Sequence, residues 1–122
     1  MIIKDLIEDY KKSVIDKFSF LITEYLFRLD QIEANADLCT IVYKKDNIII
    51  RLHSEILDNR FYFHLNDGNK IVLFHEYFKQ FDGSINWPDL MPAGRYYDDA
   101  LDRNVLLLKK YGHDFLSGKQ SL

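Results

Sequence analysis

The sequence predicts an α+β fold: an N-terminal helix, a four- to five-stranded antiparallel meander, then one or two C-terminal helices packed on one face of the sheet. The order of the hydrophobic patterns is the first reason. Apolar residues recur at intervals of three and four, then alternate in short segments between polar turns, then return to helical spacing. The second reason is composition, since 122 residues with 48% hydrophobic content suit a single domain, 1–122, with one core.

The first helix is expected from Lys4 to about Tyr25. Charged residues such as Glu8 and Lys12 fall between its apolar positions, so one face should be buried and the other solvated. The apolar stripe consists of Leu6, Ile7, Tyr10, Val14, Phe18, Leu21, Ile22 and Tyr25. Such a stripe is typical of a core-facing helix, and no function is inferred from it.

Alternating patterns predict four strands that follow the helix. They cover residues 27–32, 38–44, 47–55 and 60–65. Lys45–Asp46 is the expected turn of the second hairpin, and Asp58–Asn59 that of the third, because Asp and Asn tolerate the positive φ of a two-residue turn. With Leu57 opposite Arg60, His53 pairs with His64.

The same alternation separates two faces of the sheet. The face expected to be buried carries Ile41, Tyr43, Ile48, Ile50, Leu52, Phe61, Phe63 and Leu65. The face expected to meet water or a partner carries Thr40, Lys44, Arg51, His53, Glu55, Tyr62 and His64. We therefore expect the helices on the first face.

Signals after Leu65 are mixed. Lys70 to Phe74 fit either a fifth strand or a helix, and we expect a short strand followed by a helix to about Gln80. Ile85 to Gly94 form the longest loop, with both prolines and the only tryptophan. A last helix should begin near Asp98 or Asp99 and end at a Gly112 cap.

Composition excludes several classes of protein. The single cysteine, Cys39, cannot form an internal disulfide and should be a buried, inert thiol. A net charge of -3 argues against nucleic-acid binding and favours a basic partner. The N-terminus has no signal-peptide pattern, and charges interrupt every apolar run, so we expect a cytoplasmic protein that does not enter a membrane.

Catalytic motifs are not recognisable in the sequence. There is no Gly-x-Ser-x-Gly elbow and no glycine-rich phosphate loop. His53, His64 and Glu55 share the open face and could approach one ion, but two imidazoles are too few and the pair is more simply a surface feature. We predict a non-enzyme without metal or cofactor.

Two surfaces are candidates for binding a protein. Between Asp82 and Arg103, five aspartates oppose two arginines beside aromatic side chains, which suits an interface, although Trp87 and Met91 could instead cover the core. The candidate residues are Trp87, Asp89, Met91, Tyr96, Tyr97, Asp98, Asp99 and Asp102 in this segment, and Arg51, His53, Glu55, Tyr62 and His64 on the open face. A small-molecule or regulatory domain, with a pocket under the Trp87 loop, is the alternative.

Both ends of the chain resemble one group of bacterial proteins. Residues 18–29 follow the pattern F-x-F-L-x-x-E-Y-G-F-x-L, with Leu26 in place of Gly, and residues 107–118 follow L-L-K-K-Y-G-x-D-F-L-x-G. These patterns are similar to those of small immunity proteins of polymorphic and contact-dependent toxin systems. The resemblance implies a protector that binds a cognate toxin, often a nuclease, without catalysis; it assigns no binding residues.

Overall fold

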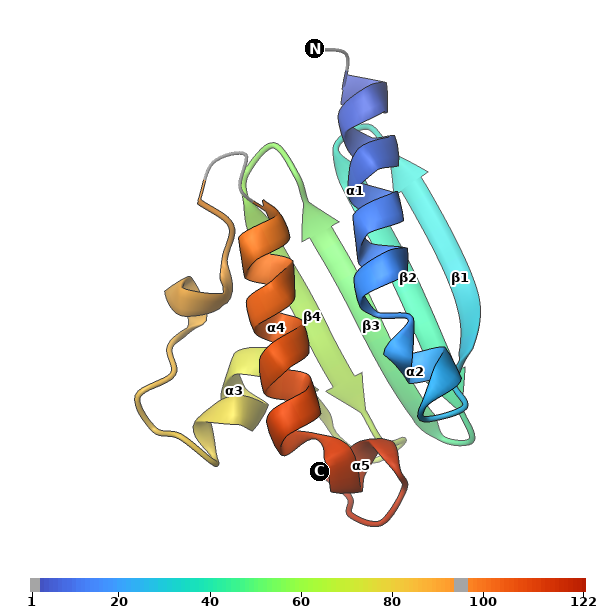
Figure 1. The fold of residues 1–122 in the computed structure, drawn as a ribbon, viewed down its shortest axis with the longest axis vertical. Helices are drawn as coiled ribbons and strands as arrows, with labels where there is room; N and C mark the ends of the chain where they lie inside the picture. Colours follow the sequence, from blue (N-terminus) through green and yellow to red (C-terminus); the bar gives the residue numbers. More distant parts are fainter. Residues whose placement is uncertain (1–2, 94–96) are drawn as a thin grey trace.

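The computed structural model describes residues 3–93 and 97–122 and has the predicted α+β architecture. Five antiparallel strands form one sheet in the order β1-β2-β3-β4-β5, and α1 and α4 lie over the same face of it (Figure 1). The strands are β1 (Arg28–Asn35), β2 (Leu38–Lys45), β3 (Ile48–Glu55), β4 (Arg60–Asn66) and β5 (Ile71–Leu73). The helices are α1 (Ile3–Lys17), α2 (Phe20–Thr23), α3 (Phe74–Lys79), the 3-10 helix η1 (Trp87–Leu90), α4 (Tyr97–Tyr111) and α5 (His113–Leu116).

The buried face of the sheet is the one that the alternation predicted. All eight residues expected there are at most 6% exposed. Aromatic rings fill the space between sheet and helices: Phe61 stacks on Phe63 with 4.6 Å between ring centroids, and Phe18 meets Phe63 edge-on at 6.1 Å. Burial of these large rings supplies much of the hydrophobic stabilisation of the fold.

The prediction of one continuous helix from Lys4 to about Tyr25 is wrong. The segment divides into α1 and α2. Phe18, Phe20 and Leu21 are all buried, at 5% exposure or less. Positions 18 and 20 of a straight helix point in nearly opposite directions, so both cannot face the core. Backbone bonds tighten here, with Leu21 N–H donating to the Phe18 carbonyl at 3.1 Å, and the bend brings both rings inward.

A left-handed residue connects α2 to the sheet. Leu26 has φ 64° and its side chain is 79% exposed. The next residue, Phe27, is buried and its N–H donates to the Leu21 carbonyl at 2.9 Å. The chain thus reverses at the position where the immunity-protein pattern carries Gly, which adopts this φ without steric cost.

The first strand is longer than the expected range 27–32 and contains a bulge. The pairing of β1 with β2 shifts between Leu29, which faces Tyr43, and Gln31, which faces Val42. The extra residue is Asp30. It interrupts the strict alternation of faces that the sequence predicts for residues 27–32. As a result Ile32 lies on the helix side of the sheet together with Leu29.

Both predicted hairpin turns differ from those in the structure. Lys45 pairs with Ile48, so the turn is at Asp46–Asn47 and not at Lys45–Asp46. Glu55 pairs with Arg60, so the next loop spans four residues, 56–59, in place of the two we expected.

The longer loop has a tertiary cause. Ile56 is only 9% exposed, and its N–H donates to the carbonyl of Asp37, in the neighbouring turn, at 2.9 Å. β3 therefore stops pairing at Glu55, two residues before the predicted Leu57, while β4 still begins at Arg60. His53 faces Tyr62, and His64 faces Arg51, in contrast to the predicted His53–His64 pair. Because the shift is two residues, every side chain keeps its predicted face.

The C-terminal half follows the prediction with one correction. Ile71–Leu73 is a strand, α3 follows, and Phe115 and Leu116 pack back into the core. Gly112 has φ -94° and is not a left-handed cap. A Cβ at this position would lie 2.6 Å from the Leu108 carbonyl oxygen, so close backbone approach explains the glycine.

Replacing Leu26 with Gly should stabilise the protein. Relief of the left-handed strain is worth about 1–2 kcal/mol, and the greater freedom of Gly in the unfolded chain removes about half of it. We expect a net gain of about 0.5–1 kcal/mol in urea unfolding. Leu26→Ala, which keeps the strain, should change stability little. Equal effects of the two substitutions would contradict this account.

Candidate functional site

The open sheet face, defined by Arg51, His53, Glu55, Tyr62 and His64, carries a short aromatic series. The His53 Nδ1 atom lies 2.7 Å from the Thr40 hydroxyl, and the His53 ring lies 6.1 Å from that of Tyr62. The ring of Trp87, from η1, lies 6.2 Å from that of Tyr62. The structure thereby joins the predicted open face to one residue of the predicted acidic loop.

The two histidines of this face favour their neutral forms. Burial lowers the pKa of His53 and of His64, and the nearby Arg51 guanidinium lowers each pKa further. Arg51 and not His53 is opposite His64, so the predicted His53–His64 pair is not formed. Within residues 3–93 and 97–122, no three His, Cys, Asp or Glu side chains gather to hold a metal ion.

The segment containing η1 is fixed along the free edge of β4. The Phe61 N–H, beyond the end of β5, donates to the Met91 sulfur at 3.2 Å. On its other side α4 holds the segment: the buried Asn104 Nδ2 donates to the Leu90 carbonyl at 3.1 Å, and Arg103 donates to the Asp89 carbonyl. This attachment sets the position of Trp87 beside the open face.

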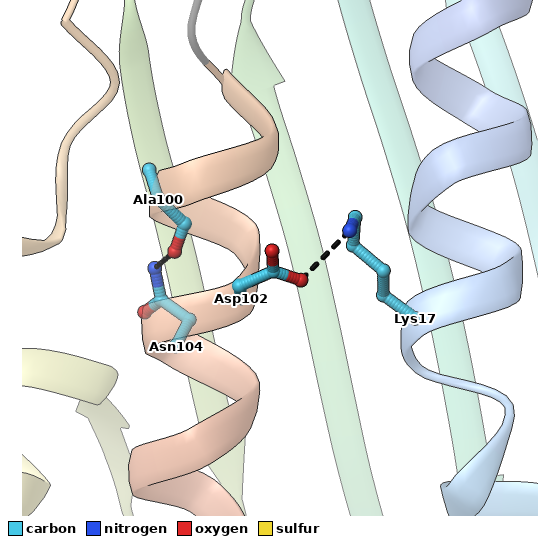
Figure 2. Close-up of polar contacts among 4 residues, drawn as sticks. All are labelled: Lys17, Ala100, Asp102 and Asn104. Atoms are coloured by element: carbon cyan, nitrogen blue, oxygen red, sulfur yellow. Dashed lines mark hydrogen bonds and ion pairs between the residues drawn. The ribbon is translucent and has the colours of Figure 1, made fainter.

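The acidic α4 surface is defined by four exposed residues: Asp98, Asp99 and Asp102 lie on α4, and Asp89 lies on the neighbouring η1. Asp98 and Asp99 occupy the first turn of α4, where the helix dipole favours negative charge. Asp102 lies one turn further and pairs with Lys17 of α1 at 2.7 Å (Figure 2). The pair joins the two long helices that cover the sheet.

The predicted loop residues do not form one continuous surface. Met91 and Tyr97 pack against the core, and Tyr97 meets the ring of Tyr10 edge-on at 5.3 Å. Tyr96 and Arg95 lie outside the described residues. Met91 therefore covers the core, as in the alternative interpretation, while the carboxylates of α4 face solvent and Trp87 borders the open face.

The cavity beneath the Trp87 loop is small. It is lined by Phe61, Phe63, Leu73, Phe74, His75, Trp87, Leu90, Met91 and Asn104. Its volume of about 10 Å³ is near the minimum for one water molecule and far below that of a metabolite pocket. Cys39, the other reactive candidate, is fully buried, and burial raises its thiol pKa to about 11.

Comparisons with family models, curated proteins and solved structures found no match. In the part of the chain that the structure describes, none of the helices combines the length and the apolar character needed to span a membrane.

Sequence reasoning missed Asn104, although the sequence held a signal for it. Asn104 lies on the stripe of Leu101 and Leu108, which are fully buried. An amide on a core stripe needs a hydrogen-bond partner inside the protein, and here the partners are the carbonyls of Leu90 and Ala100 (Ala100 is shown in Figure 2).

Replacing Asn104 with Ala should release the η1 segment. The change leaves the Leu90 carbonyl without its side-chain donor and opens a void, so we expect a loss of about 1–3 kcal/mol in denaturant unfolding. Amide exchange of residues 85–93 should quicken. Arg103→Ala removes an exposed contact to the same segment and should cost less than about 1 kcal/mol. Wild-type exchange rates in the Asn104 variant would refute its role.

The protein should lose stability as the pH falls below about 6.5, the unperturbed histidine value. The folded-state pKa values of His53 and His64 lie below those of the unfolded chain, so the unfolded state binds protons first. The stability that the neutral forms of His53 and His64 contribute is present above the pKa of histidine in the unfolded chain. It is lost as the pH falls through their lower pKa values in the folded protein.

Urea midpoints measured between pH 7.5 and 5 test this. The variant His53→Gln/His64→Gln should show a smaller decline than wild type. Arg51→Ala should also reduce the loss of stability at low pH, because Arg51 lowers the pKa values of both histidines. An unchanged pH slope in both variants would exclude these histidines as its source.

Proposed function

We propose that the chain is a non-enzymatic protein-binding domain of the immunity-protein type, which binds a cognate toxin and neutralises it. The observation that carries the proposal is the acidic α4 surface, where four exposed carboxylates lie on α4 and η1. Opposite charge on a toxin would steer the two proteins together and fix their orientation. A basic nuclease domain is the class of toxin that this surface fits best.

The scaffold supports this use of the surface in two ways. Asp89 accepts a hydrogen bond from the Asn86 N–H at 3.0 Å, which fixes its side chain at the start of η1. The Lys17–Asp102 pair and Asn104 hold α4 against α1 and η1. Preorganised charges bind with a smaller loss of side-chain entropy than mobile ones. The resemblance of both chain ends to immunity proteins supports the proposal independently of these contacts.

Co-expression with the product of the gene immediately upstream is the direct test. The chain should restore growth, and the purified pair should form a complex whose association rate falls as salt rises. A chain that neither binds nor protects against any neighbouring gene product would sink the proposal.

Charge reversal should locate the contact. We expect Asp98→Lys/Asp99→Lys to slow association with the toxin by about tenfold to a hundredfold at low salt. The matched control is Glu24→Lys/Asp58→Lys, which changes the net charge equally at exposed residues outside α4 and η1. Stopped-flow measurement of association should show little effect of the control. Equal slowing by both variants would mean that only net charge matters and would exclude the acidic α4 surface as the contact.

A further inference from the structure

The two edges of the sheet differ in their covering. At one edge β5 pairs with residues 64–66 of β4, and Met91 accepts the Phe61 N–H beyond it. At the other edge β1 pairs with β2, and seven of its eight residues are exposed. Along the outer side of β1, the backbone groups have no strand partner among the residues that the structure describes. Such an edge is a template for another strand.

A groove runs beside this edge on the helix side. Its volume is about 270 Å³, and it is lined by Glu8, Lys11, Lys12, Ile15 and Asp16 of α1 and by Ile32 of β1. Ile32 is 45% exposed, and the bulge at Asp30 places it on this side of the sheet. Side chains of a strand alternate between faces, so every second residue of a strand added to β1 would face the helix side, and the one beside Ile32 could enter the groove.

The other face of the same edge carries a carboxylate. Beyond the bulge, residues 31–35 pair regularly with β2, and Glu33 is their midpoint. Its carboxylate accepts a hydrogen bond from Gln31 Nε2 at 2.9 Å on the open side of the sheet. The residue opposite Glu33 in an added strand would be its closest cross-strand neighbour. Opposite charges in that position are favourable, so Lys or Arg fits best.

A second copy of the chain is a poor occupant. Two copies that pair antiparallel over the whole regular segment 31–35 must be related by an axis at its midpoint. Glu33 of each copy then lies directly opposite Glu33 of the other, and like charges in that position are destabilising. The edge therefore suits a strand from a different protein.

We propose that the β1 edge binds an extended segment of a partner protein, which extends the sheet by one strand. Its central Lys or Arg faces Glu33, and an apolar side chain enters the groove beside Ile32. Main-chain hydrogen bonds supply affinity, while these two side chains supply specificity. The interaction requires neither the acidic α4 surface nor a toxin, so it can succeed or fail separately from the proposed function.

A synthetic peptide, acetyl-Thr-Val-Lys-Val-Thr-amide, is the probe. In NMR titrations of the whole protein at up to millimolar concentration, it should shift amides of residues 31–35 and of the α1 residues that line the groove. Exchanging its Lys for Glu should weaken binding about fivefold to thirtyfold, because an opposite-charge pair becomes a like-charge pair. N-methylation of alternate backbone amides should abolish binding, since it removes main-chain donors.

Charge exchange in the protein provides the matched control. Glu33→Lys should reverse the preference, so that the Glu peptide binds more tightly than the Lys peptide. Glu24→Lys makes the same change at an exposed residue at the end of α2 and should leave the preference unchanged. Three results would overturn the proposal: no shifts in β1, binding that survives N-methylation, or a concentration-dependent dimer in sedimentation that Glu33→Lys disrupts.

Discussion

Burial of one sheet face under α1 and α4 is the constraint on which the other features depend. Phe61 and Phe63 stack on that face, and Tyr10 of α1 packs 6.0 Å from Phe61 while its hydroxyl shares a buried hydrogen bond with Ser54 of β3. Because side chains alternate along each strand, the same packing directs polar side chains such as His53 and Tyr62 to the opposite face. The positions of both helices, and hence of the carboxylates on α4, follow from this one apolar surface.

The prediction of the faces survived an error in register because the two depend on different information. Face is a local property with a period of two, so a shift of two residues between β3 and β4 leaves it intact. Register depends on the length of the turn. Burial of Ile56 and its hydrogen bond to Asp37 set that length, and Asp37 is distant in sequence. The bend after Lys17 has a similar origin, since the core holds both Phe18 and Phe20.

The candidate site was predictable where a local rule governs it. Aspartates before an apolar helical stripe predicted the first turn of α4, and alternation predicted which side chains lie on the face opposite the core. Thr40, which we expected to meet water there, is buried at 7% exposure. No local sequence rule predicts the path of the η1 segment. Its position depends on the contact of Met91 with the Phe61 N–H and of Asn104 with the Leu90 carbonyl. These contacts place Trp87 beside Tyr62 and orient Met91 toward the core, which spacing alone does not specify.

Each carboxylate of the acidic α4 surface also stabilises the fold. Measurements of binding must therefore separate an effect on stability from an effect on association. Asp98 and Asp99 interact with the helix dipole, Asp89 bonds the start of η1, and Asp102 pairs with Lys17. Reversing Asp98 and Asp99 therefore removes about 0.3–1 kcal/mol of stability per residue as well as charge for a partner. A slower association at unchanged folded fraction separates the two effects, because steering weakens with salt while the folded fraction is fixed by unfolding measurements made in the same buffer. The same contacts within the fold hold these carboxylates in place before any partner binds.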